Sequence, residues 1–356
     1  MKTKIKRNKA IFIGFFFCNL IIAFLTPYIL PERYFNDTIT IIFDKGHEIG
    51  WFGSYPFAIM FYKLTGMRHL PFFVIALIQF PIVTYILYKI GVPSNFHKLN
   101  VKNGLVYVAL LLTGIYMSMP TKEFITFLMF CSIPFIFQSN KKPRFKIIFS
   151  LVLIACFSFF RPYYLLIPIF AIGMYAVSFI KFENKTFSTI FYGLLIAIFL
   201  SLSHGVVRGE YISKLTRENY VMNNINKNNI NTAIVSPISQ DTWYGEAFGI
   251  VYGFMAVNVP IVEAIKHVLS PQVLAFVVWQ LLIFYILFVR FSRCLKNRKQ
   301  YQLELWILLI LFAYFIVQGI FEPDLGTSIR HKIGLFPLIY FALYYENFRK
   351  EIQSSI

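Results

Sequence analysis

The segment Ile147–Ile180 reads IIFSLVLIACFSFFRPYYLLIPIFAIGMYAVSFI and is almost unbroken apolar sequence apart from Arg161-Pro162. As a single α-helix it would be about 50 Å long, whereas the hydrocarbon core of a bilayer is roughly 30 Å thick. We therefore expect a helical hairpin that turns at Arg161, in a chain that crosses a membrane several times.

The composition of the whole chain supports a membrane protein. Hydrophobic residues make up 58% of the 356 residues and charged residues only 14%, against about 25% charged residues in a typical soluble domain. The net charge of +18 does not indicate nucleic-acid binding, because the Lys and Arg residues are spread between apolar segments. The four cysteines show no metal-site spacing and are interpreted as small buried side chains: Cys18, Cys131, Cys156 and Cys294.

Apolar segments that approach the roughly 20 residues of a spanning helix recur along the chain. They predict an all-α, polytopic membrane protein with about ten transmembrane helices, in which residues 1–356 form a single integral membrane domain. The expected spans lie near residues 10–30, 71–89, 103–120, 123–138, 146–160, 162–180, 187–203, 271–289, 302–321 and 332–345.

The distribution of charge predicts the orientation of these spans. With the N-terminus inside, most of the 34 Lys and Arg residues fall on the inner segments, and most of the 16 Asp and Glu residues fall on the outer ones. Because Lys and Arg in short loops favour the cytoplasmic side of a membrane, we expect both termini to be cytoplasmic.

Two long segments then face outward. Residues 31–70 are expected to carry a short interfacial helix over Ser54–Thr65. Residues 204–270 form a large outer loop between the seventh and eighth helices. Within it, residues 247–262 are apolar, but a span there would reverse the side of the basic segment that follows. We interpret them as an interfacial or re-entrant helix, interrupted by Gly249, Gly253 and Pro260.

Charged residues at the outer ends of the early spans are candidates for chemistry. Asp37 lies a few residues beyond the first span, and Lys122-Glu123 opens the fourth. Glu123 has an alternative interpretation, as a favourable negative charge at the positive end of a helix. Arg161 could bind an anion, since its guanidinium group matches phosphate oxygens, or it could be a turn residue that extends toward the headgroups.

A second group of charges precedes the last span. Arg330, His331 and Lys332 stand at its entrance, after two acidic residues and the segment 326–328, which we expect to be flexible and to offer hydrogen-bond donors. Charge beside hydrocarbon is costly and is usually retained for a task. We therefore expect these basic residues to bind a diphosphate; anchoring in the headgroup region is the alternative.

The large outer loop carries polar and aromatic side chains of the kinds that hydrogen-bond to sugars and stack on them. Any solvated loop contains such residues too, so an ordinary surface loop is the alternative. The glycan-binding candidates are Arg208, Glu210, Asp241, Trp243 and Tyr244.

These features together fit a polyprenyl-diphosphate-linked sugar, which has a long apolar tail, an anionic headgroup and a polar glycan. Breaking the sugar–diphosphate bond needs cations that stabilise the departing diphosphate and a base that deprotonates the attacking hydroxyl. Asp37 and Glu123 are candidates for the base, and His331 is a further acid or base because its ordinary pKa lies near neutrality. The expected diphosphate ligands are Arg161, Arg330, Lys332 and Lys122.

Three motifs carry a resemblance to a known group of enzymes. These are Asp37 soon after the first span, the segment Ser54–Phe57, and Gly326–Lys332 ahead of Phe336-Pro337. The pattern resembles that of multipass polyprenyl-dependent glycosyltransferases, the GT-C-like group. The chain length, the span count and the large outer loop resemble bacterial O-antigen and capsule repeat-unit polymerases of the Wzy type.

The resemblance implies a polymerase that transfers a growing glycan from undecaprenyl diphosphate onto a new repeat unit. It places the protein in the bacterial inner membrane, with an active site facing the periplasm or exterior, and it implies no metal or other cofactor. Expected partners are the lipid bilayer, an undecaprenyl-diphosphate-linked oligosaccharide, a chain-length regulator and a flippase, and no nucleic acid.

Two alternatives remain open at this point. A GT-C-type transferase of a single sugar from a polyprenyl-phosphate donor would use the early outer Asp as its base, usually with a divalent metal. A transporter or flippase of a lipid-linked glycan belongs to another class. Transporters often contain internal repeats and midplane polar sites, whereas here no repeat is evident and the polar residues cluster on one face.

Overall fold

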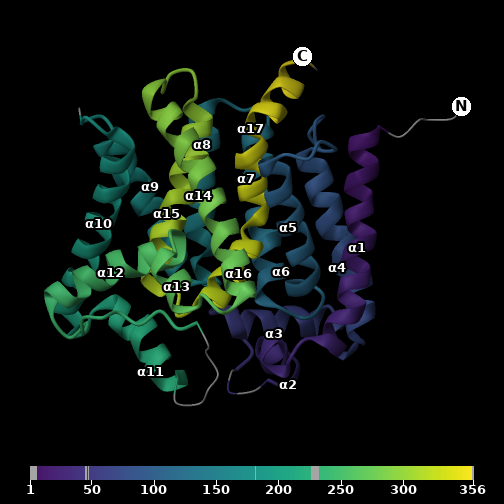
Figure 1. Cartoon of the computed structure of the whole chain (residues 1–356), viewed down its shortest axis with the longest axis horizontal. Helices are drawn as coiled ribbons and strands as arrows, with labels where there is room; N and C mark the ends of the chain where they lie inside the picture. The colour runs from purple at the N-terminus through teal and green to yellow at the C-terminus, as the bar shows by residue number, and fades with distance from the viewer. Residues whose placement is uncertain (1–5, 45, 47, 181, 226–231, 355–356) are drawn as a thin grey trace, which may run out of the picture. The chain divides into compact units, whose positions relative to one another are not determined.

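The computed structural model describes residues 6–44, 46, 48–180, 182–225 and 232–354. Within these ranges the chain is helical, with one isolated antiparallel bridge between Ala233 and Asp324 and no strand (Figure 1). The all-α class is therefore confirmed. The ends of the chain and residues 226–231 of the large loop lie outside the described residues.

Five helices in the described ranges are long and apolar enough to cross a membrane. They match expected spans one, two, seven, eight and nine. Several of them expose large apolar side chains, as α1 does with Phe17, Ile21 and Phe24, and such faces suit the bilayer interior. The five are α1 (Arg7–Ile29), α4 (Phe72–Ile90), α10 (Lys185–Arg208), α14 (Pro271–Lys296) and α15 (Gln302–Phe321).

The other expected spans correspond to shorter or divided helices, so the ten-span topology and the cytoplasmic termini stay predictions. The long apolar segment that contains Arg161 is broken where the sequence predicts, by 3-10 turns on either side of that residue. The helices concerned are α5 (Val101–Tyr116), α6 (Lys122–Phe130), α7 (Ser132–Gln138), α8 (Pro143–Cys156), η3 (Phe157–Phe159), η4 (Pro162–Leu165), α9 (Leu166–Val177) and α17 (Phe336–Ser354).

The chain divides into two compact units. Unit 1 contains residues 1–150, 156–162 and 330–356, and unit 2 contains residues 151–155 and 163–329. Besides helices already named, unit 1 includes η1 (Glu32–Phe35), α2 (Asn36–Phe43), α3 (Ser54–Leu64) and η2 (Met67–His69). Unit 2 includes η5 (Lys214–Glu218), α11 (Asn219–Ile225), α12 (Trp243–Asn258) and α13 (Ile261–Lys266), and α16 (Leu325–Gly334) is shared by the two units.

Unit 1 is built around close helix contacts. Helix α1 packs against α4 and α5, and Asn19 of α1 donates a hydrogen bond to the Thr113 hydroxyl of α5 at 3.2 Å. Helix α17 is buried along most of its length. The Tyr340 hydroxyl donates to the carbonyl of Gly91, and the Tyr344 hydroxyl donates to Asn103, each at 2.6 Å. Such bonds satisfy polar groups that would otherwise be costly to bury.

Unit 2 is organised around α15, whose residues are nearly all buried. Helices α12 and α9 pack against it. The buried side chain of Arg217 donates to the carbonyls of Gly319 at 2.6 Å and Gly249 at 2.7 Å. Gly253 makes this approach feasible, because a Cβ there would lie 1.7 Å from Arg217 Nη1 and 2.1 Å from the Gly319 oxygen.

The structure corrects one expectation about the large outer segment. Gly249 and Gly253 do not interrupt a helix; they lie inside α12, where they admit the side chains of Gln240 and Arg217. Of these three residues only Pro260 lies outside a helix, between α12 and the short helix α13, because proline cannot continue the helical hydrogen bonding. At 16 residues α12 is shorter than a typical span, and its interfacial or re-entrant character stays a prediction.

Replacing Gly253 with Ala should destabilise the protein. The added methyl group meets a buried guanidinium and a backbone carbonyl, and overpacking of this kind costs about 1–3 kcal/mol. Thermal unfolding of the purified protein in detergent measures the effect. The matched control is Gly104→Ala in α5, where a Cβ meets nothing within 4 Å, and which should be neutral or slightly stabilising. Equal unfolding temperatures for the two variants would contradict the packing described.

Candidate functional site

Asp37 lies in the first turn of α2 and is buried in unit 1. Its Oδ2 atom is 3.3 Å from Lys122 Nζ and 3.1 Å from Arg330 Nη2. Its Oδ1 atom accepts a 2.5 Å hydrogen bond from the hydroxyl of Tyr55 in α3. Both carboxylate oxygens are therefore engaged.

Tyr55 also contacts the neighbouring cation. The ammonium group of Lys122 lies 3.6 Å from the centroid of the Tyr55 ring, within the range of a cation–π interaction. Tyr55, Asp37 and Lys122 thus contact one another in a closed set of three. The sequence assigned Tyr55 only to an interfacial helix, and no spacing rule connects it to Asp37.

Glu123 is the second carboxylate of the site and is fully buried in the first turn of α6. Its Oε1 atom lies 3.5 Å from Arg161 Nη2, 3.5 Å from Arg330 Nε and 3.8 Å from His331 Nε2. These distances are longer than ordinary hydrogen bonds. Because Arg330 contacts Asp37 as well as Glu123, it faces both carboxylates and joins the two halves of the site.

The electrostatics of Asp37 reflect competing effects. Burial alone would raise the pKa of its carboxyl group, since a low-dielectric environment disfavours charge. Lys122 and Arg330, together with the Tyr55 hydroxyl, outweigh burial and hold that pKa well below its usual range. Asp37 is therefore an ionised carboxylate in the structure as it stands.

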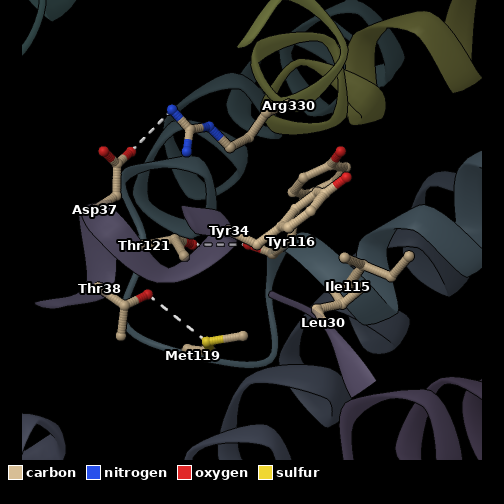
Figure 2. A pocket seen from close by; sticks show the side chains of 9 residues that line it. All are labelled: Leu30, Tyr34, Asp37, Thr38, Ile115, Tyr116, Met119, Thr121 and Arg330. Carbon is tan, nitrogen blue, oxygen red and sulfur yellow. Dashed lines mark hydrogen bonds and ion pairs between the residues drawn. The ribbon is translucent and has the colours of Figure 1, made fainter. Parts of the chain in front are cut away.

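A small pocket adjoins the Asp37–Arg330 pair (Figure 2). In the figure Arg330 extends toward Asp37, and the side chains of Leu30, Ile115 and Met119 lie away from this ion pair. The cavity volume is about 10 Å³, which is room for roughly one water molecule. The remaining lining residues are Tyr34, Thr38, Tyr116 and Thr121.

Tyr62 of α3 fixes the start of α6. Its hydroxyl accepts from the Thr121 amide at 3.0 Å, donates to the Thr121 carbonyl at 3.1 Å and accepts from the Gln79 side chain at 3.0 Å. Thr121 occupies the N-cap position, but its hydroxyl donates to the Tyr116 carbonyl rather than capping the helix. Tyr62 thereby positions Lys122, which is the next residue after Thr121 in the chain.

Helix α16 carries Arg330, His331 and Lys332. Asp324 caps its beginning, where the carboxylate accepts from the Thr327 amide at 2.9 Å and from the Thr327 hydroxyl at 2.6 Å. The expectation of a flexible segment at 326–328 is therefore wrong, because these residues are helical and the Thr327 hydroxyl is used internally. Lys332 is buried in the same helix.

The end of α16 approaches α6 closely. A Cβ at Gly334 would lie 3.0 Å from the Thr126 side chain and 3.4 Å from the Glu123 carbonyl oxygen. A larger residue at this position would push the two helices apart. Glycine here therefore lets Arg330 and His331 reach the carboxylate of Glu123.

The glycan-binding candidates lie in unit 2 and form no part of this cluster. Asp241 pairs with Lys214 and accepts a hydrogen bond from Ser239, and both contacts lower its pKa. Trp243 and Tyr244 are 65% and 54% exposed and meet edge to face, with ring centroids 5.7 Å apart. Arg208 and Glu210 are exposed at the end of α10.

In unit 1 the structure thus brings together six residues that were predicted separately from sequence, namely Asp37, Lys122, Glu123, Arg161, Arg330 and His331. In the described part of the chain, no three or more His, Cys, Asp or Glu side chains are grouped so as to hold a metal ion. Comparisons with protein-family models, curated proteins and solved structures find no match to this chain.

Tyr62→Phe should lower the thermal stability of the protein. The substitution removes a buried hydroxyl that serves the Thr121 backbone and Gln79, and leaving such groups unsatisfied costs about 1–3 kcal/mol. The control is Tyr85→Phe in α4, whose side chain is largely exposed and should be indifferent to the change. Unfolding temperatures in detergent provide the comparison, and an unchanged value for Tyr62→Phe would show that the hydroxyl does not anchor α6.

Proposed function

We propose that this chain is a membrane glycosyltransferase that uses the unit 1 charge cluster to act on a polyprenyl-diphosphate-linked oligosaccharide. The observation that carries the proposal is the position of Arg330, which faces both Asp37 and Glu123 beside a partly apolar pocket. Such a transfer needs a group that binds the anionic diphosphate and a group that acts as a base. Arg330 can bind the anion, and one of the two carboxylates beside it can act as the base.

The cations of the cluster suit a phosphate group. Lys122, Arg161 and Arg330 each lie within 3.5 Å of Asp37 or Glu123, so they converge on one small region. A guanidinium group presents a rigid fork that matches two phosphate oxygens, and a lysine ammonium adds a compact charge. A diphosphate could contact more than one of these groups at once.

The surroundings suit the lipid part of such a substrate. Leu30, Ile115 and Met119 line the pocket next to the charged pair, and several long helices expose apolar faces. An isoprenoid chain could therefore lie in an apolar environment while its phosphate groups reach Arg330. An apolar surface next to a group of cations favours a lipid-linked anion over a free sugar nucleotide as the substrate.

The chemistry follows from these contacts. The oxygen of an acceptor hydroxyl forms a bond to the anomeric carbon, and the bond from that carbon to the diphosphate oxygen breaks. The electron pair of that bond leaves with the diphosphate, whose charge Arg330 and its neighbours stabilise. The hydroxyl proton passes to a carboxylate, for which Asp37 and Glu123 are the candidates. His331 Nε2 lies 3.8 Å from Glu123 Oε1, so it faces this carboxylate without a direct hydrogen bond to it.

The finer proposal is polymerisation of repeat units at the outer face of a bacterial inner membrane. It draws on the resemblance in the sequence and on the exposed pair Trp243 and Tyr244 in unit 2, since paired aromatic rings offer a surface on which sugars stack. Transfer of a single sugar would use the same cluster, so the length of the product separates these two reactions.

The test is reconstitution of the purified chain in lipid nanodiscs with undecaprenyl-diphosphate-linked oligosaccharides, without any transbilayer gradient. Products longer by whole repeat units support the polymerase, and products longer by one sugar indicate the single-sugar transferase. No new product from a folded protein, across donors of several glycan structures, contradicts the proposal. Movement of the intact lipid across vesicles would then favour transport.

Arg330→Ala should reduce transfer about 10²- to 10³-fold, because it removes a cation that stabilises the leaving group. Arg330→Lys keeps the charge but loses the planar fork, so we expect a smaller loss of about tenfold. Initial rates measured by chromatography of the glycan products give both values.

Arg68→Lys is the matched control, since Arg68 pairs with Asp44 in the same unit outside the cluster. It should leave the rate unchanged. Full activity in Arg330→Ala would remove Arg330 from the mechanism.

A further inference from the structure

The carboxylate of Asp37 is held by the same cations that the proposed function gives to the substrate. Lys122 and Arg330 both contact its Oδ2 atom, at 3.3 and 3.1 Å. Its Oδ1 atom accepts from Tyr55. A carboxylate whose charge is balanced by two cations in this way is a poor acceptor for the proton of a substrate hydroxyl.

The space beside the pair does not accommodate a phosphate group in addition to it. The adjoining pocket has a volume of about 10 Å³, enough for roughly one water molecule. A phosphate group that enters this pocket therefore competes with the partners that Arg330 already has. A diphosphate offers more charge and more oxygens to a guanidinium group than one carboxylate does.

We infer that Asp37 is an internal counter-ion that the phosphate group of the ligand displaces from Lys122 and Arg330, and that Tyr55 is the positioning residue that retains Asp37 at the site. The inference rests on the proposed function, because it assumes that Lys122 and Arg330 receive a diphosphate. It adds an order of events, in which the lipid-linked donor binds first and thereby frees the base.

The exchange alters the chemistry of Asp37. While Lys122 and Arg330 contact it, the pKa of Asp37 stays well below its usual range, and a weak base takes up protons poorly. When the ligand holds these cations, burial raises that pKa and Asp37 becomes a stronger base. The other charged or ionisable groups facing this part of the site include Arg161, Glu123 from α6 and His331 from α16.

Tyr55 is suited to retain Asp37 because its contacts with Asp37 and Lys122 differ in kind. The hydroxyl holds Oδ1, which the ligand does not need. The ring lies under the Lys122 ammonium at 3.6 Å, so Lys122 keeps one contact whether it faces Asp37 or a phosphate oxygen. Replacement by Phe removes only the first contact, and replacement by Leu removes both.

Pyrophosphate binding tests the displacement without any transfer reaction. The dissociation constant of inorganic pyrophosphate is measured by calorimetry on the full chain in nanodiscs at neutral pH. Asp37→Asn removes the competing charge, so it should bind pyrophosphate about tenfold more tightly than the original chain while losing transfer activity. Asp44→Asn, at the residue that directly follows α2, is the matched control, and its affinity should not change.

The outcomes distinguish the displacement of Asp37 from the anion site itself. Pyrophosphate bound by the original chain, but no more tightly by Asp37→Asn, overturns the displacement and leaves the anion site intact. Pyrophosphate bound with unchanged affinity by Lys122→Ala and Arg330→Ala, or not bound by the original chain, overturns the anion site of the proposed function and the displacement with it.

Tyr55→Phe tests the positioning role. It should leave the pyrophosphate dissociation constant within about twofold and lower the transfer rate about tenfold, since a hydrogen bond to a charged group is lost. The acid limb of the pH–rate profile should move to higher pH, because the lost donor stabilised the ionised carboxylate. Tyr55→Leu should change the dissociation constant as well. An unchanged rate and acid limb in Tyr55→Phe would show that Tyr55 only fills space.

Discussion

Mutual neutralisation of buried charges is the constraint on which unit 1 depends. Asp37 and Glu123 are buried among apolar helices, where an isolated carboxylate would be very costly. Arg330 faces both of them, and Lys122 and Arg161 supply one further cation each. Loss of one partner would leave another buried charge without compensation, so α2, α6 and α16 are held to a narrow range of positions.

That constraint explains features of the fold that have no chemistry of their own. Tyr62 fixes the backbone at the start of α6, and Gly334 allows α16 to approach α6. Asp324 caps α16 and so begins the helix that carries Arg330. Each of these contacts positions a charge rather than touching a ligand. The pocket beside the network is small, because the cations and carboxylates already contact one another and leave little space between them.

The sequence predicts which residues belong to the candidate site better than it predicts how those residues contact one another. Asp37, Glu123 and Arg330 attract notice in the sequence because charge is rare in such an apolar chain. Tyr55 did not, since an aromatic residue in an interfacial helix has an ordinary explanation and its role depends on a contact with distant Asp37. Gly253 was misread as a helix breaker, because the sequence does not show that Arg217 approaches it.

The sequence by itself determined that this protein is helical and rich in helices able to cross a membrane, since the length and hydrophobicity of a segment are local properties. It also determined which charged residues are exceptional. Only the tertiary structure decided which of those charges meet, and which apolar helices are covered by protein. Helices α1 and α15 are alike in sequence character, yet α1 is largely exposed and α15 is almost wholly buried. An apolar side chain is equally compatible with lipid and with a protein core, so hydropathy alone cannot distinguish the two environments.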